Sequence, residues 1–521
     1  MISPTAKQPE LRRDVSIWGS YMWGYADVGA DIYAALGLVI AAAQGMANLA
    51  FLFAGLVYII IGLAYTELAS AYPVAGGGQY YTLRGLGDFW GFMAGAALLL
   101  DYTIDIALFA VASAGYINFF FPALGQFVVS WGPLHSIHPI WCLEALAIIV
   151  FLTILNIRGI RESSLLNEVI GALDIVTESS IIIFGFLFAW RPELLVHQWV
   201  ISKPTMFQFM YGSSLAIISF VGLESISQAA QETKRPATIV PRTSLTLIFT
   251  VFIFALAFSN LSLGILPWQE FRGREGDPVA MLAHNIPYIG LIAGPFAAIL
   301  GATILLISSN SGVMSASRLT YSMSELKLLP AWFDVVHPKF RTPVRTILVF
   351  TGIGALQTLL SFLTPKAMDT LGNMYAFGAT LGYSLVFVSL IKLRFSDPYS
   401  PRPYKVPFNI PWKTRDGRTV DIPILGFFGL LGVSSILFMV ILTHAIGRIA
   451  GPAWVICWLL FYFWYRRRKG RPLFGSLKHD WEKEQMDVLT SAEEFDLVEQ
   501  YKQALLGRNR QRAKLRELGQ K

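Results

Sequence analysis

The sequence is dominated by apolar runs that are long enough to cross a lipid bilayer. Hydrocarbon contains no water, so the backbone there must satisfy its own hydrogen bonds, and a run of about 20 apolar residues predicts a transmembrane α-helix. Hydrophobic residues make up 54% of the chain and charged residues 14%, which excludes an ordinary soluble domain. We predict an all-α integral membrane protein with twelve transmembrane helices, near residues 22–44, 46–69, 90–120, 139–157, 165–190, 208–230, 243–266, 289–322, 344–363, 370–393, 423–444 and 450–465.

Lysine and arginine predict the orientation, because cytoplasmic connections carry an excess of these residues. With the N-terminus inside, the even-numbered connections are cytoplasmic, and they hold Arg84; Arg158 and Arg161; Lys234, Arg235 and Arg242; Lys339, Arg341 and Arg345; and Lys405, Lys413, Arg415 and Arg418. We therefore expect a multi-pass protein of the cell membrane with both termini in the cytoplasm. The chain divides into a cytoplasmic segment (1–16), a membrane domain (17–465) and a cytoplasmic tail with an amphipathic helix (466–521). In the tail, Ser491-Ala492-Glu493-Glu494 has the spacing of a capping box, and Phe495, Val498, Tyr501 and Leu505 follow one helical stripe.

Two of the apolar runs contain a glycine that is followed two positions later by a carboxylate. These pairs are Gly29 with Asp31 in the first run and Gly222 with Glu224 in the sixth. An ionisable group at membrane depth costs about 2.5 kcal/mol or more, so it normally faces a partner, a cavity or a pathway. Glycine allows a helix to break where its backbone can meet a ligand. Interrupted runs in both halves of a chain predict the binding site of a transporter.

The third and fifth runs add further carboxylates. Asp101 and Asp105 are four residues apart and share one helical face, where paired carboxylates can share a proton. Asp105 is almost as well explained by a structural hydrogen bond to a neighbouring helix end. Asp174 either takes up and releases a proton itself, or is a buried neutral residue bonded to a hydroxyl, or holds a cation together with hydroxyls of the eighth run, Ser308, Ser309 and Ser311.

Short motifs follow one another in a specific order between residues 15 and 410. They are Gly29-Ala30-Asp31-Ile32, Pro73-Val74-Ala75-Gly76-Gly77, Leu155-Asn156 with Gly159, Phe220-Val221-Gly222-Leu223-Glu224 and Ser315-Ala316-Ser317-Arg318. In this order they resemble the amino acid–polyamine–organocation superfamily. The resemblance implies a LeuT-like fold with inverted five-helix repeats (about 17–190 and 207–393), two further helices, and discontinuous helices 1 and 6 around a central site. It also implies alternating access driven by an ion gradient.

The first motif departs from the superfamily's usual Gly-Ser-Gly-Ile, whose free backbone N–H groups hold an amino acid's carboxylate. Here Asp31 replaces the second glycine. An ionised Asp31 about 4 Å from a substrate carboxylate costs roughly 4 kcal/mol at intermediate dielectric. Asp31 is therefore protonated, or points elsewhere, or the substrate is not bound there by a carboxylate. The pair Asp101-Tyr102 is similar to one that helps to form the ion site of Kup-type potassium importers, which belong to the same superfamily.

We assign the substrate site to residues of the first, third and sixth runs: Asp27, Gly29, Ala30, Asp31, Tyr33, Asp101, Tyr102, Phe220, Gly222 and Glu224. Ion or proton coupling is assigned to Asp31, Asp101, Asp105, Asp174, Ser308 and Ser309. Glu67 ranks lower, because it lies toward a run's end where solvation is easier. The core holds seven carboxylates without a matching intramembrane lysine or arginine: Asp27, Asp31, Asp101, Asp105, Asp174, Glu178 and Glu224. This acidic load favours a cationic partner, whether a coupling proton, a metal ion or an amine.

These features predict a permease that imports an amino acid or related amine, a small-molecule substrate, together with a proton or sodium ion. A proton-coupled potassium importer, with a cation as substrate, is the first alternative because of Asp31 and the Asp101-Tyr102 pair. A transporter-like sensor that signals through its tail is the second. No catalytic residue, metal cluster or cofactor is expected, so the protein should not be an enzyme. The expected surroundings are the lipid bilayer and no nucleic acid, and association into a homo-oligomer stays open.

Overall fold

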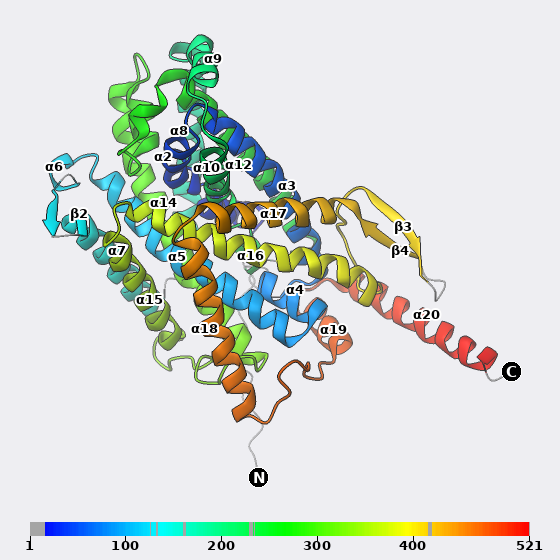
Figure 1. Ribbon diagram of the computed structural model, residues 1–521. Coiled ribbons are helices and arrows are strands. Elements are labelled where there is room, and N and C mark those ends of the chain that lie inside the picture. The colour runs from blue at the N-terminus through cyan, green and yellow to red at the C-terminus, as the bar shows by residue number, and fades with distance from the viewer. Residues whose placement is uncertain are drawn as a thin grey trace.

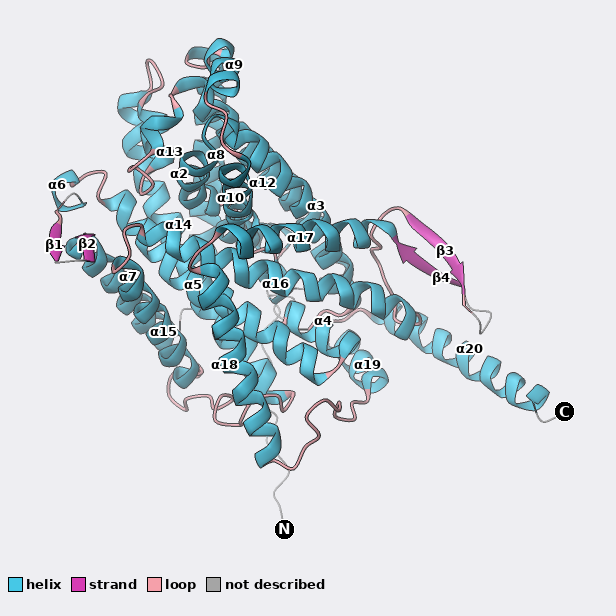
Figure 2. Cartoon of the chain, in the orientation of Figure 1, coloured by secondary structure: helices cyan, strands magenta, loops and turns pink. Residues whose placement is uncertain are grey.

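The computed structural model of the protein describes residues 16–74, 76–125, 127–131, 134–159, 163–228, 233, 235–414 and 419–519. The predicted N-terminal segment lies outside these residues apart from Ser16, as do Ala75, Arg161, Lys234, Arg415 and Arg418 of the motifs and connections. Nearly all of the described chain is helical, with two short antiparallel hairpins (Figure 2). The predicted all-α membrane class is therefore confirmed, although the sequence analysis predicted neither hairpin.

Figure 1 labels most of the elements and colours them in chain order. The first part comprises α1 (Ile17–Val28), α2 (Asp31–Ala43), η1 (Gln44–Met46), α3 (Ala47–Ala71), α4 (Gly77–Leu86), α5 (Asp88–Ile117), α6 (Pro122–Gly125), β1 (Val129–Trp131), β2 (Leu134–Ile137), α7 (Pro139–Arg158), α8 (Ser163–Phe188) and α9 (Pro192–Ile201). The middle part comprises α10 (Met206–Leu215), η2 (Ala216–Phe220), α11 (Glu224–Gln228), α12 (Pro236–Ile265), η4 (Trp268–Phe271), α13 (Pro278–His284), α14 (Gly290–Glu325), α15 (Val344–Phe362) and α16 (Ala367–Ser396). The last part comprises β3 (Asn409–Lys413), β4 (Thr419–Pro423), α17 (Ile424–Thr443), α18 (Gly447–Arg468), α19 (Trp481–Ser491) and α20 (Phe495–Gly519).

Eleven helical stretches of the described chain are long and apolar enough to cross a membrane. Ten of them coincide with the predicted runs from 90–120 onward. The remaining stretch, Ile17–Ala71, has 55 residues, and a straight helix of that length would be about 80 Å long, far more than the ~30 Å of hydrocarbon. It is broken between α2 and α3, where Gln44 has φ 54° and ψ −133°. The predicted runs 22–44 and 46–69 therefore lie on either side of a real turn.

The two predicted helix interruptions differ in the structure. The second is a complete break: Val221 is extended, with ψ 156°, and Gly222 has φ 106°, a conformation that residues with a side chain rarely adopt. At the first, Gly29 and Ala30 keep right-handed helical angles, and the N–H of Gly29 still donates to the Tyr25 carbonyl at 2.8 Å. Gly29 is needed for space instead, since a Cβ there would lie 2.9 Å from the Tyr25 ring. At the first interruption the hydrogen-bonding pattern of the helix changes between α1 and α2, but the backbone at Gly29 and Ala30 is not unwound.

Helix α5 lies at the centre of the molecule, packed against α14 and α16 (Figure 1). Its most apolar part is fully buried, whereas only 22–28% of the corresponding parts of α7, α17 and α18 is buried, and each of these helices carries exposed apolar side chains. Exposed apolar faces of this kind on membrane-length helices are the surfaces that lipid covers. The acidic residues of α5 are consequently held in the protein interior.

The tail packs back onto the helical body through α19 and the start of α20. The amide of Gln485 donates to the carbonyl of Ala71 at 2.8 Å, and Glu484 accepts a hydrogen bond from the Tyr80 hydroxyl at 2.8 Å. Val498 and Tyr501 of the predicted apolar stripe are buried, but Phe495 is exposed. The predicted capping box at Ser491 is wrong, because this residue ends α19 and its hydroxyl donates to the Val488 carbonyl.

Candidate functional site

The break in the sixth run faces a carboxylate of α1. A Cβ at Gly222 would lie 3.0 Å from Oδ2 of Asp27, so the broken backbone and this side chain are in close contact. The hydroxyls of Ser225, Ser308 and Ser311 also lie beside the Asp27 carboxylate. A cavity of about 10 Å³ opens at Asp27 between α1 and α14, lined also by Trp23, Ala26, Ile307, Asn310, Ser311 and Met314. That volume is about what one water molecule requires.

Five carboxylates from α1, α2, α5 and α11 are gathered around this break, each of them buried: Asp27, Asp31, Asp101, Asp105 and Glu224. They lie close enough to interact electrostatically with one another. Within the described part of the chain, no ion pair with lysine or arginine reaches any of the five. We refer to these five residues as the central carboxylates. Such a concentration of buried negative charge requires protons or a cationic ligand.

Hydrogen bonding distinguishes the central carboxylates from one another. Glu224 accepts from the Tyr383 hydroxyl at 2.9 Å, and Asp105 accepts from the Tyr375 hydroxyl at 3.3 Å. Asp31 has no hydrogen-bond donor to either oxygen among the described residues. Asp101 likewise receives no donor from them, and its carboxyl group lies within hydrogen-bonding reach of Glu224. Two carboxyl groups bond to each other only when one of them holds a proton.

A second acidic pair lies on α8. Asp174 accepts a hydrogen bond from the Tyr33 hydroxyl at 2.6 Å, and Glu178 accepts one from the Tyr25 hydroxyl. Both carboxyl groups are buried, and each keeps one oxygen without a donor among the described residues. The pair therefore ties α8 to α1 and α2 by two tyrosine bonds.

The predicted serine ligands of Asp174 lie elsewhere. Ser308 and Ser311 are beside Asp27, and the Ser309 hydroxyl donates to the Ile106 carbonyl at 2.9 Å. Asp174 instead has the contact that the alternative interpretation predicts, in which a buried carboxyl group is bonded to a hydroxyl. The donor is the phenol of Tyr33.

Aromatic residues enclose the central carboxylates. Phe220 stacks on Tyr58, with ring centroids 5.0 Å apart, and Tyr102 is buried near Asp101 and Glu224. The sequence analysis missed Tyr58 and Tyr383, although Tyr383 has a usable signal. It lies eight residues after Tyr375, which places both hydroxyls on one face of α16.

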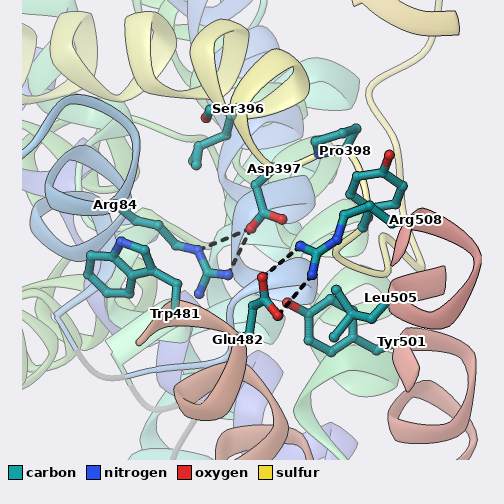
Figure 3. A pocket seen from close by; sticks show the side chains of 11 residues that line it. Arg84, Ser396, Asp397, Pro398, Trp481, Glu482, Tyr501, Leu505 and Arg508 are labelled. Atoms are coloured by element: carbon teal, nitrogen blue, oxygen red, sulfur yellow. Dashed lines mark hydrogen bonds and ion pairs between the residues drawn. The ribbon is translucent and has the colours of Figure 1, made fainter. Parts of the chain in front are cut away.

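A cavity of about 230 Å³ lies between α4, the end of α16 and α19–α20 (Figure 3). Two ion pairs cross it: Arg84 with Asp397 at 2.7 Å and Arg508 with Glu482 at 2.6 Å. Its charges are thus already matched, and none of the central carboxylates lines it. We assign it to the attachment of the tail.

The Arg84–Asp397 pair predicts a pH-dependent contribution to stability. Burial acts to raise the pKa of the Asp397 carboxyl, but Arg84, Ser400 and Arg402 outweigh burial and leave that pKa below its ordinary value. The paired carboxylate therefore stabilises the fold above the unfolded-state pKa of about 3.9, and this contribution is lost as the pH falls through the lower folded-state pKa. The variant Asp397→Asn should lower the melting temperature at pH 7, and its difference from the wild type should shrink toward pH 3.

Thermal unfolding in detergent across this pH range measures the effect. Asp421→Asn is the matched control, because the Lys405–Asp421 pair has a similar distance of 2.8 Å but is largely exposed. Exposed pairs contribute about 0–1 kcal/mol, so this control should change little at any pH. A difference between Asp397→Asn and the wild type that stays constant down to pH 3 would contradict the assignment.

Comparison with known proteins gives the family. The model of the family described as "Amino acid permease" matches residues 16–464. The branched-chain amino acid permease BcaP of Bacillus subtilis is 25% identical over 480 residues, covering 90% of this chain and 97% of that protein. The methylthioribose transporter of Bacillus subtilis is 26% identical over 487 residues, covering 90% and 96%. Cationic amino acid transporter 4 of Mus musculus is 29% identical over 417 residues, covering 77% and 63%. Since the family model spans most of the chain, this protein belongs to the amino acid permease family and is a membrane transporter, not an enzyme.

Proposed function

We propose that the protein is a proton-coupled secondary active transporter that imports an amino acid or related amine across the cell membrane by alternating access. The observation that carries the proposal is the cluster of central carboxylates at the helix break, which no basic side chain of the described chain neutralises. A substrate ammonium group and a coupling proton are the two cationic partners that we assign to this acidic cluster. The names of the relatives cover branched-chain and cationic amino acids and methylthioribose, so the carboxylates are the better guide to the substrate.

Asp31 is the residue that we expect to contact the substrate's ammonium group, with Asp27 beside it. Asp31 lies at the start of α2 and lacks a hydrogen-bond donor among the described residues, so it is free to accept from a ligand. A carboxylate on the substrate, where present, would be placed away from Asp31, toward backbone N–H groups of the break around Gly222. This arrangement replaces the Gly-Ser-Gly-Ile site that the superfamily resemblance implies.

The coupling proton is assigned to the Asp101–Glu224 contact. Two facing carboxyl groups attract each other while they share a proton and repel each other once it is lost. Loss of that proton would therefore weaken the contact between α5 and α11. Asp105, which is bonded to Tyr375, and Asp174, which is bonded to Tyr33, are further positions that could accept a proton. The sodium alternative would instead place the ion between Asp27 and the hydroxyls of Ser308 and Ser311.

The proposed topology has twelve crossings, with α1–α2 and α3 counted separately, and both termini in the cytoplasm. The excess of lysine and arginine in the even-numbered connections supports this orientation. The proposed inverted repeats span about 17–190 and 207–393, and each contains one of the two interruptions, near Gly29 and near Gly222.

Uptake into proteoliposomes with an inward proton gradient tests the proposed function. Neutral, cationic and acidic amino acids, amines without a carboxylate, and rubidium are compared in parallel. We expect accumulation of amine-bearing substrates that a protonophore abolishes and that a sodium gradient does not restore. Accumulation of rubidium alone would identify a potassium importer. Absence of all transport, together with a tail-dependent cellular signal, would identify a sensor.

A further inference from the structure

The β3–β4 hairpin projects from the helical body between α16 and α17 (Figures 1 and 2). Its strands pair Ile410 with Ile422 and Trp412 with Val420, so these four residues share one face. On this face Val420 is buried, whereas Ile410 is 51% and Trp412 is 56% exposed. The other face carries polar residues, including Lys413 and Asp421. The hairpin is therefore amphipathic, and half of its apolar face has no cover within the described chain.

The root of the hairpin, where its two strands meet the helical body, lies beside the first residue of α17. The N–H of Ile424, the first residue of α17, donates to the carbonyl of Phe408 at 3.1 Å. Phe427 and Phe428, one turn further along α17, are exposed on a helix of membrane length. The hairpin therefore starts beside a helix whose exposed apolar side chains are covered by lipid.

Phe408 gives a second indication that an apolar medium covers this region. It has φ 59°, a left-handed conformation that costs a bulky residue stability, yet its side chain is 72% exposed. A strained backbone that holds a phenylalanine away from the protein core is explained when the ring has another apolar phase to enter. Aromatic side chains are enriched at the boundary between hydrocarbon and headgroups.

The net charge of the connection between α16 and α17 indicates that the membrane surface it meets is anionic. Between Ser400 and Pro423 the sequence has five basic residues and two acidic ones. One of the acidic residues, Asp421, is already paired with Lys405. A net positive connection beside a transmembrane helix is attracted to anionic lipid headgroups of the cytoplasmic leaflet.

We propose that the β3–β4 hairpin is a membrane-surface anchor, which inserts Phe408, Ile410 and Trp412 among the anionic headgroups beside α17. The hairpin is held rigidly enough to present this face, because the N–H of Val406 donates to the buried carboxylate of Glu67 at 2.8 Å. The anchor fixes the connection between α16 and α17 at the membrane surface while other helices move.

Site-specific fluorescence in lipid nanodiscs tests the anchor. Cys142 and Cys457 are first replaced, and an environment-sensitive fluorophore is attached in the variant Trp412→Cys. Thr419→Cys is the matched control, because this residue is exposed on the same hairpin but on its polar face. Leu431→Cys, on the exposed face of α17, is the control for a lipid contact. We expect the label at 412, but not at 419, to shift to the blue and to lose most of its emission to headgroup-level spin-labelled lipid.

Nanodiscs of different lipid composition test whether an anionic membrane surface, and not another apolar partner, covers this face of the hairpin. The blue shift at 412 should be stronger in nanodiscs that contain phosphatidylglycerol than in pure phosphatidylcholine, and the combined variant Lys413→Gln/Arg415→Gln/Arg418→Gln should remove this difference. A label at 412 that behaves like the label at 419 in both lipids would overturn the proposal, and so would an equal blue shift in detergent. The measurement needs no transport, so its failure leaves the proposed function untouched.

Discussion

Replacing Asp31 with asparagine is expected to weaken binding of the amine-bearing substrate by about 30-fold or more. Removal of one partner from a buried, hydrogen-bonded charge pair costs about 2–5 kcal/mol in binding, and each 1.4 kcal/mol is about tenfold. Asparagine keeps the size of the side chain but cannot balance an ammonium charge. Equilibrium binding of the best substrate from the uptake screen, in detergent at neutral pH, measures the loss.

Glu224→Gln should separate coupling from binding. Glutamine can still accept from the Tyr383 hydroxyl, which is 2.9 Å from Glu224 in the wild type, but it cannot share a proton with Asp101. We expect this variant to exchange substrate across the membrane at equal concentrations while losing accumulation against a gradient. Glu270→Gln, which changes an exposed carboxylate that is not one of the central carboxylates, is the control for both assays. If Asp31→Asn binds the substrate as tightly as the wild type, Asp31 is not part of the substrate site. If Glu224→Gln still accumulates substrate in response to a proton gradient, Glu224 has no role in coupling.

Much of the site could be predicted from the sequence because buried charge obeys a strong constraint. A carboxylate in an apolar run cannot face lipid cheaply, so Asp27, Asp31, Asp101, Asp105 and Glu224 were each expected in the interior, and the structure gathers them there. The break at Gly222 was also predictable, since only glycine readily adopts its φ of 106°. These inferences rest on local rules that a single sequence contains.

The partners of the carboxylates could not be predicted in the same way. The Tyr33–Asp174 bond joins residues 141 positions apart, and the Tyr383–Glu224 bond joins residues 159 apart. Such contacts depend on how helices pack, which the periodicity of one helix does not determine. The same reason explains why one of the three interpretations of Asp174 placed it with the serines of the eighth run. The helical backbone at Gly29 was missed because a glycine that is required for close packing gives the same signal as one that is required for a break.

Glu67 is the clearest case in which the sequence misled, and it carries the largest expected effect on stability. Its position toward a run's end suggested solvation, but the structure buries it completely. Nε and Nη2 of Arg394 each lie 2.6 Å from a Glu67 oxygen, and Nε of Arg402 lies 3.5 Å away. Glu67 therefore joins α3 to the end of α16 and to the root of the β3–β4 hairpin.

Glu67→Gln is expected to lower the free energy of unfolding by about 3–5 kcal/mol, because it leaves the buried guanidinium of Arg394 without its counter-charge. Chemical unfolding in detergent at pH 7 measures the loss. The double variant Glu67→Gln/Arg394→Gln should recover part of it, since replacement of both charges removes the uncompensated one. Lys405→Gln, which breaks an exposed pair on the same connection, should cost less than about 1 kcal/mol. If Glu67→Gln is no more destabilising than Lys405→Gln, the buried network does not hold the hairpin, and the rigid presentation of its apolar face must come from the packing of β4 on α16 instead.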